Sequence, residues 1–197
     1  MTRGNQKGFS LVELLVSVTV LTLALSGLAS LLIQNARINK SQRMTAEIQA
    51  NARNTLSMVV QKLRSAGWDP TNAGLATVTL DADTTDSISE IEVFADINED
   101  GDTLDADEQT LIRHLGASSQ VVWRPTSDVN DPFIILSGDI SNDADGDGNI
   151  EPMFVPNANP PTRITVQITA QSPAPDPTSR QFIRYTVTSD VVLRKAL

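Results

Sequence analysis

The sequence predicts an α+β fold in which one long N-terminal helix packs against a mostly antiparallel β-sheet. No proline occurs before Pro70, so a helix can run through the first third of the chain without interruption. After Pro70, short runs of alternating apolar and polar residues replace the helical pattern. The helix and the sheet would then bury their apolar sides against each other.

Composition excludes several classes of function. The 197 residues carry a formal net charge of −9, which argues against nucleic acid or an anionic membrane surface as the main partner of the soluble part. The chain has no cysteine, and this excludes disulfides, thiolate metal sites and cysteine catalysis. His114 is the only histidine, and we interpret it as a surface or strand residue. Trp68 and Trp123 are interpreted as anchors of the helix end and the sheet. No catalytic motif is present, so we expect a protein that is not an enzyme.

Residues 9–33 are apolar or small except for one carboxylate, Glu13. As a helix they would be about 37 Å long, enough to cross a hydrocarbon core of about 30 Å. A secretory signal cleaved near Ala29 or Ser30 is the alternative, but the segment is longer than a usual signal core. A carboxylate inside a membrane is costly without a partner, and such residues are usually functional.

Residues 34–68 continue the helix with an amphipathic pattern. Apolar residues recur at spacings of three and four, which indicates one buried stripe: Met44, Ile48, Ala52, Leu56, Val59, Val60 and Leu63. Gly67, followed by Pro70, predicts the end of the helix. A membrane anchor followed by a separate helix fits the same periodicity.

Residues 69–197 predict a β-rich head. Candidate strands lie at residues 91–95, 110–115, 120–124, 133–136, 163–171 and 182–193. The last two can form a hairpin around a proline-rich loop at 172–180, which cannot join a central strand.

Two acidic loops in this head carry oxygen ligands at alternate positions around a glycine, as calcium-binding loops do. The first loop, 96–108, offers Asp96, Asn98, Asp100, Asp102, Asp105 and Glu108. The second loop, 143–151, offers Asp143, Asp145, Asp147, Asn149 and Glu151. Glu108 comes one residue later than the closing glutamate of an EF-hand, and the second loop needs a closing ligand from elsewhere. Structural calcium is therefore expected, with solvated acidic turns as the alternative.

The N-terminal residues resemble a known signal. Gly8 followed by Phe-Ser-Leu-Val-Glu-Leu at 9–14 is similar to the class III signal of type IV pilins and type II secretion pseudopilins. The resemblance implies that a prepilin peptidase removes a leader, residues 1–8, by cutting between Gly8 and Phe9, and then methylates Phe9. It also implies that Glu13 pairs with the N-terminal amine of a neighbouring subunit in a filament, and that 9–33 forms the filament core.

Residues 48–70 resemble the end of the long helix in PilW-type minor pilins. The similarity lies in Asn51, Arg53, Leu63, Arg64, Ala66 and Gly67. It implies a type IV pilin-like fold and a structural minor pilin that assembles through its N-terminal helix, as part of an initiating or tip complex.

The expected partners are other pilins, the prepilin peptidase and the inner-membrane assembly machinery. The expected location is a single pass through the inner membrane with a periplasmic head, and then a cell-surface pilus. A pseudopilin in a periplasmic pseudopilus, or a membrane-anchored or secreted calcium-binding domain, is the alternative.

Overall fold

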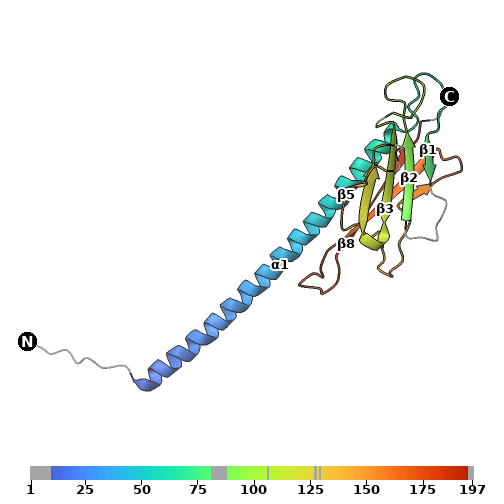
Figure 1. The fold of residues 1–197 in the computed structure, drawn as a ribbon. Coiled ribbons are helices and arrows are strands. Elements are labelled where there is room, and N and C mark those ends of the chain that lie inside the picture. The colour runs from blue at the N-terminus through green and yellow to red at the C-terminus, as the bar shows by residue number, and fades with distance from the viewer. Residues whose placement is uncertain (1–9, 81–87, 106, 127, 129, 195–197) are drawn as a thin grey trace, which may run out of the picture.

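The computed structural model describes residues 10–80, 88–105, 107–126, 128 and 130–194. It has one long helix that carries a β-rich head at its C-terminal end (Figure 1). The predicted processing residues Gly8 and Phe9 lie outside the described residues.

Helix α1 (Leu11–Ser65) is continuous over 55 residues, about 82 Å at the usual rise. This confirms the prediction of one uninterrupted helix, and the alternative of a separate second helix is wrong. Ser10 is the N-cap residue, and the helix stops where Gly67 adopts a positive φ of 71°. The backbone N–H of Gly67 then donates to the carbonyl of Phe94, which ties the helix end to the head.

The two halves of α1 differ in burial as predicted. Residues 10–40 are exposed, whereas one stripe of the second half is buried: Met44, Ile48, Ala52, Thr55, Val59, Val60 and Leu63. This spacing of three and four keeps the stripe on the helix face that the head covers.

The head contains two antiparallel sheets, where the sequence predicted one. The first has the order β1 (Val78–Leu80), β2 (Ile88–Phe94), β3 (Gln109–Leu115), β4 (Gln120–Arg124) and β5 (Ile134–Ser137). A short 3-10 helix (Gly116–Ser118) joins β3 to β4. The second has the order β6 (Phe154–Pro156), β7 (Arg163–Gln171) and β8 (Arg184–Val192). An isolated bridge between Ile140 and Ala170 connects the segment after β5 to β7.

The core lies between α1 and the second sheet. Helix α1 packs mainly on β7 and β8, with fewer contacts to the first sheet. The alternation in β7 places Ile164, Val166 and Ile168 in this core, as the sequence predicts. His114 is a residue of strand β3, one of the two placements expected from the sequence, and it is fully buried and not on the surface. It faces inward because it shares the core side of the strand with Ile112.

Candidate assembly helix and acidic loops

The first half of α1 exposes a continuous apolar surface. Fourteen large apolar side chains between Leu11 and Ile33 are each more than half exposed. Soluble monomers rarely expose an apolar patch of this extent, which marks a membrane or protein contact. By length and composition α1 can span a membrane, and the head covers none of its most apolar stretch.

Polar side chains within this apolar half form hydrogen bonds with the backbone of their own helix. The hydroxyls of Ser17, Thr19, Thr22 and Ser26 each donate to a carbonyl one turn earlier, at 2.7 to 2.8 Å. Because hydrocarbon offers no hydrogen-bond partners, such internal pairing makes these residues tolerable in a membrane or a dry filament core.

Glu13 is the acidic residue of the first helical turn, and its side chain is exposed. A negative charge at this end of a helix is favoured by the unpaired N–H groups of the first turn. The carboxylate is therefore placed near the chain terminus that cleavage after Gly8 would create, and is open to a neighbouring molecule.

The first acidic loop, 96–108, gathers part of the predicted ligand set. Asp100, Asp105 and Glu108 each bring one carboxylate oxygen within 4.8 Å of the others. The cause is local: Glu108 Oε1 accepts the N–H groups of Ile97 and Asn98, and its Oε2 accepts that of Asp105. These bonds fold the end of the loop back over its start, and Glu108 is only 2% exposed.

The other predicted ligands of this loop have different partners. Asp96 is fully buried, and its two oxygens accept the N–H groups of Asp100 and Gly101. Asn98 donates its amide nitrogen to the carboxylates of Asp100 and Asp105, while its amide oxygen accepts the backbone N–H of Asp100. Asp102 accepts the N–H of Leu104 and stands outside the carboxylate group. The N–H of Asp102 lowers the pKa of Asp100, so this carboxyl stays ionised.

The second acidic loop, 143–151, gathers Asp143, Asp145 and Glu151 in the same way. Glu151 reaches this group because its Oε2 accepts the N–H of Ala144. Asp147 and Asn149 hydrogen-bond to each other and lie outside the group.

A positively charged arginine side chain lies beside the second loop. Arg184 Nη2 of β8 lies 3.7 Å from Asp143 Oδ2, and a Cβ at Gly146 would come within 2.5 Å of Arg184 Nη1. The guanidinium therefore compensates part of the negative charge of this loop, a feature that the local sequence of 143–151 does not reveal.

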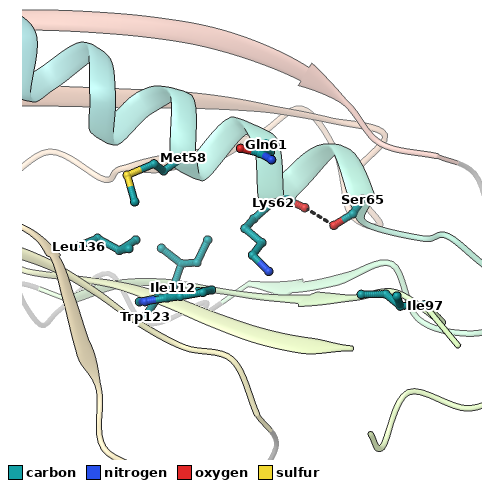
Figure 2. Close-up of a pocket in the computed structure, with 8 residues that line it drawn as sticks. All are labelled: Met58, Gln61, Lys62, Ser65, Ile97, Ile112, Trp123 and Leu136. Atoms are coloured by element: carbon teal, nitrogen blue, oxygen red, sulfur yellow. Dashed lines mark hydrogen bonds between the residues drawn. The ribbon is translucent and has the colours of Figure 1, made fainter. Parts of the chain in front are cut away.

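An apolar cleft of about 330 Å³ separates α1 from the first sheet (Figure 2). Met58 and Lys62 of α1 face Ile112 and Trp123 across it. The Lys62 ammonium lies 5.0 Å from the ring centroid of Trp123, a favourable cation–π contact. Trp123 thus belongs to the sheet beneath the helix, whereas Trp68 lies at the helix end under the guanidinium of Arg194, 4.6 Å from its ring centroid.

Comparison with known proteins identifies the N-terminal signal. The family model described as the prokaryotic N-terminal methylation motif matches residues 3–29. No curated protein and no solved structure shows a significant match to the chain. The matched segment includes Gly8, Phe9 and Glu13 and runs into the exposed half of α1.

The motif and the fold together support a type IV pilin-like protein with a class III signal. A long helix, apolar in its first half, packs by its second half against antiparallel sheets, which is the pilin-like layout. Such a chain fits single-pass membrane anchoring, and its motif implies processing by a prepilin peptidase.

Proposed function

We propose that the chain is a minor pilin, a structural subunit of a type IV pilus and not an enzyme. One observation carries the proposal: the methylation motif at 3–29 leads directly into a helix half that the head leaves uncovered. The leader 1–8 is removed between Gly8 and Phe9, Phe9 is methylated, and the subunit waits in the inner membrane with its head in the periplasm.

Assembly uses the exposed half of α1 and Glu13. Neighbouring helices bury their apolar side chains against one another, which replaces lipid contacts with a dry filament core. Glu13 meets the N-terminal amine of a neighbouring subunit, so the charge enters the core together with its partner. Removing one member of a buried ion pair costs about 3–5 kcal/mol because the other charge is stranded.

The head determines which neighbouring subunits are bound. We assign the subunit to an initiating or tip complex with other minor pilins. The similarity of residues 48–70 to PilW-type minor pilins supports this assignment. A pseudopilin of a type II secretion system is the second candidate, since the same motif and helix serve both filaments.

The test of assembly is incorporation of Glu13→Ala and Glu13→Gln into fibres in the native host. Both variants remove the charge and leave the cleavage site intact, so processing should continue while incorporation falls at least about tenfold, a conservative part of the cost of breaking the pair. Ser26→Ala is the matched control, because it lies in the same apolar half and loses only a bond to its own helix.

Normal incorporation of processed Glu13→Gln would contradict the ion-pair mechanism. Equal loss of fibres in the Ser26→Ala control would show that any change in the apolar half disturbs assembly, and would contradict a specific role for Glu13.

We also propose that the first acidic loop binds structural calcium. Support comes from the carboxylates of Asp100, Asp105 and Glu108, which converge within 4.8 Å, and from seven acidic residues in 96–108. Calcium favours six to eight such hard oxygen ligands, and Asp96, Asn98 and Asp102 are further oxygen-bearing side chains of the same loop. In this role the ion orders the loop between β2 and β3.

Calorimetric titration of the full chain in detergent with calcium, after treatment with a chelator, tests this proposal. Glu108→Gln should abolish the binding heat of this loop, and Asp131→Asn, outside both loops, should leave it unchanged. Unchanged heat in the Glu108→Gln variant would contradict calcium binding at 96–108.

A further inference from the structure

The loop between β7 and β8, residues 172–183, reaches far down α1 toward the apolar half (Figure 1). Its tip, at Pro177 and Thr178, shares a cavity of about 360 Å³ with four residues of α1: Ser30, Gln34, Arg37 and Ile38. The part of the head that reaches nearest to the N-terminal half of α1 therefore lies beside the point where the apolar stretch of the helix ends.

The distance along α1 from its first residue to the level of this tip is close to the thickness of the hydrocarbon core of a membrane. Ser30 lies 19 residues after Leu11, the first residue of α1, which corresponds to about 29 Å along the helix axis. The hydrocarbon core of a bilayer is about 30 Å thick. When the apolar half of α1 spans a membrane, the loop tip is thus level with the lipid headgroups on the side of the head.

The loop is built to hold a fixed position. Three prolines restrict its backbone, and its base closes where Ser172 and Ile183 exchange hydrogen bonds. Asp176, the one acidic residue of the loop, is only 6% exposed. The N–H of Ser179 and, less strongly, the hydroxyl of Ser41 of α1 hold the pKa of Asp176 below its usual value.

The exposed charge around the tip is positive. Arg37 lines the cavity, and Arg180 stands exposed on the loop itself. Lys40 follows one turn after Arg37 on the exposed helix. Long basic side chains at the end of a membrane-spanning helix reach back to the headgroup level and pair with lipid phosphates.

We propose that the tip of the 172–183 loop docks on the phospholipid headgroups of the membrane while the chain is anchored, with Arg37 contacting lipid phosphate. The contact sets how far the head stands above the bilayer and is released when the subunit leaves the membrane. The inference rests on the membrane anchoring in the proposed function, and not on filament assembly or Glu13.

Single thiols report this contact, because the chain has no cysteine of its own. Thr178→Cys places a fluorophore at the loop tip, where the side chain is exposed. Asn130→Cys labels the loop between β4 and β5, where the side chain is exposed and does not line the cavity, and Leu21→Cys labels the middle of the apolar stretch. The full chain is reconstituted in vesicles of phosphatidylethanolamine and phosphatidylglycerol that carry quenchers either on headgroups or on acyl chains.

The proposal expects headgroup quenchers to act on the label at 178 and not on the label at 130, with acyl-chain quenchers acting on the label at 21. Adding Arg37→Gln should lower the equilibrium constant for docking at 178 about fivefold, the usual effect of one basic residue at an anionic surface. Arg43→Gln is the matched control, since Arg43 lies outside the cavity.

A label at 178 that stays as accessible to water as the label at 130, while the label at 21 lies among acyl chains, would overturn the docking and leave anchoring intact. A label at 21 outside the acyl region would overturn the anchoring as well. Quenching at 178 that disappears when the protein is diluted in lipid would assign the surface to a second copy of the chain and would also overturn the proposal.

Discussion

Asn51 of α1 and Ser137 at the end of β5 hold the helix and the first sheet together through a buried polar contact. Ser137 Oγ donates to Asn51 Oδ1 at 2.7 Å, and Asn51 Nδ2 donates to the carbonyl of Gly138, also at 2.7 Å. The contact matters because α1 packs mainly on the second sheet and leaves a cleft above the first. Asn51 thereby fixes the position of a sheet that apolar packing holds only in part.

Asn51→Ala should lower the free energy of unfolding by about 1–3 kcal/mol, since it removes two hydrogen bonds that are each worth about 0.5–1.5 kcal/mol. Urea unfolding of the full chain in detergent measures this loss. Asn54→Ala is the control, because Asn54 is exposed on the same helix and should change stability little. Equal effects of the two substitutions would contradict a specific bridge.

Gly67→Ala should destabilise the junction between α1 and the head. A Cβ there would lie 2.9 Å from Thr77 Cγ2 and 3.0 Å from the Arg194 carbonyl, and the positive φ adds strain. We expect a loss of about 2–4 kcal/mol in thermal or urea unfolding. Gly74→Ala separates the two causes, because Gly74 has a φ of 77° with open space around it, and should cost only about 1 kcal/mol.

His114 should make stability fall in mild acid. Burial lowers its pKa, and Nε2 bonds the carbonyl of Ile140. Below the ordinary histidine pKa of about 6.5, the unfolded chain takes up a proton that the folded chain rejects, so stability is lost as the pH falls. The slope is at most about 1.4 kcal/mol per pH unit.

The measurement is the urea midpoint at pH 7.5 and at pH 5.5, for the parent and for His114→Gln. Glutamine can still donate a hydrogen bond to the carbonyl of Ile140 but does not titrate. The urea midpoint of the variant should therefore not fall between pH 7.5 and pH 5.5 as that of the parent does. Burial raises the pKa of Glu92, so this residue makes stability rise as the pH falls. Both proteins contain Glu92, so its effect cancels in the comparison. A parent midpoint that changes no more than that of the variant would show that His114 is not the sensor.

The two acidic loops should bind calcium with different affinities. Arg184 already compensates Asp143 in the second loop, so Arg184→Gln should tighten calcium binding there by up to about fivefold, the usual limit of a partly exposed ion pair. The first loop, which Arg184 does not touch, should be unaffected. Calorimetry resolves the two sites, and an equal change at both loops would contradict local competition.

The helix and the best strand are predictable from sequence because their periodicity is long. Residues 11–65 contain no proline and repeat one apolar stripe from Met44 to Leu63, and the sequence of β7 alternates over nine residues. The short strands β1 and β6, of three residues each, carry too little alternation to be recognised. The division into two sheets also escapes the sequence, since it depends on pairings between distant segments.

The candidate sites follow the same rule. The methylation motif is contiguous, so Glu13 and the cleavage site are readable without a structure. In the loops, residue type indicates calcium, but hydrogen bonds decide which side chains converge. Asp147 and Asn149 bond each other, and Arg184 arrives from a strand 41 residues after Asp143. The burial of His114 likewise depends on the segment around Ile140 that closes over it.

The N-terminal peptide of the protein purified from the membranes of its own host tests the central claim most directly. Mass spectrometry should find a chain that begins at Phe9 and carries one methyl group on its amine. This N-terminal amine is the group with which Glu13 of a neighbouring subunit pairs during assembly. A chain that begins near Ser30, or that still carries Met1, would contradict the pilin-like account.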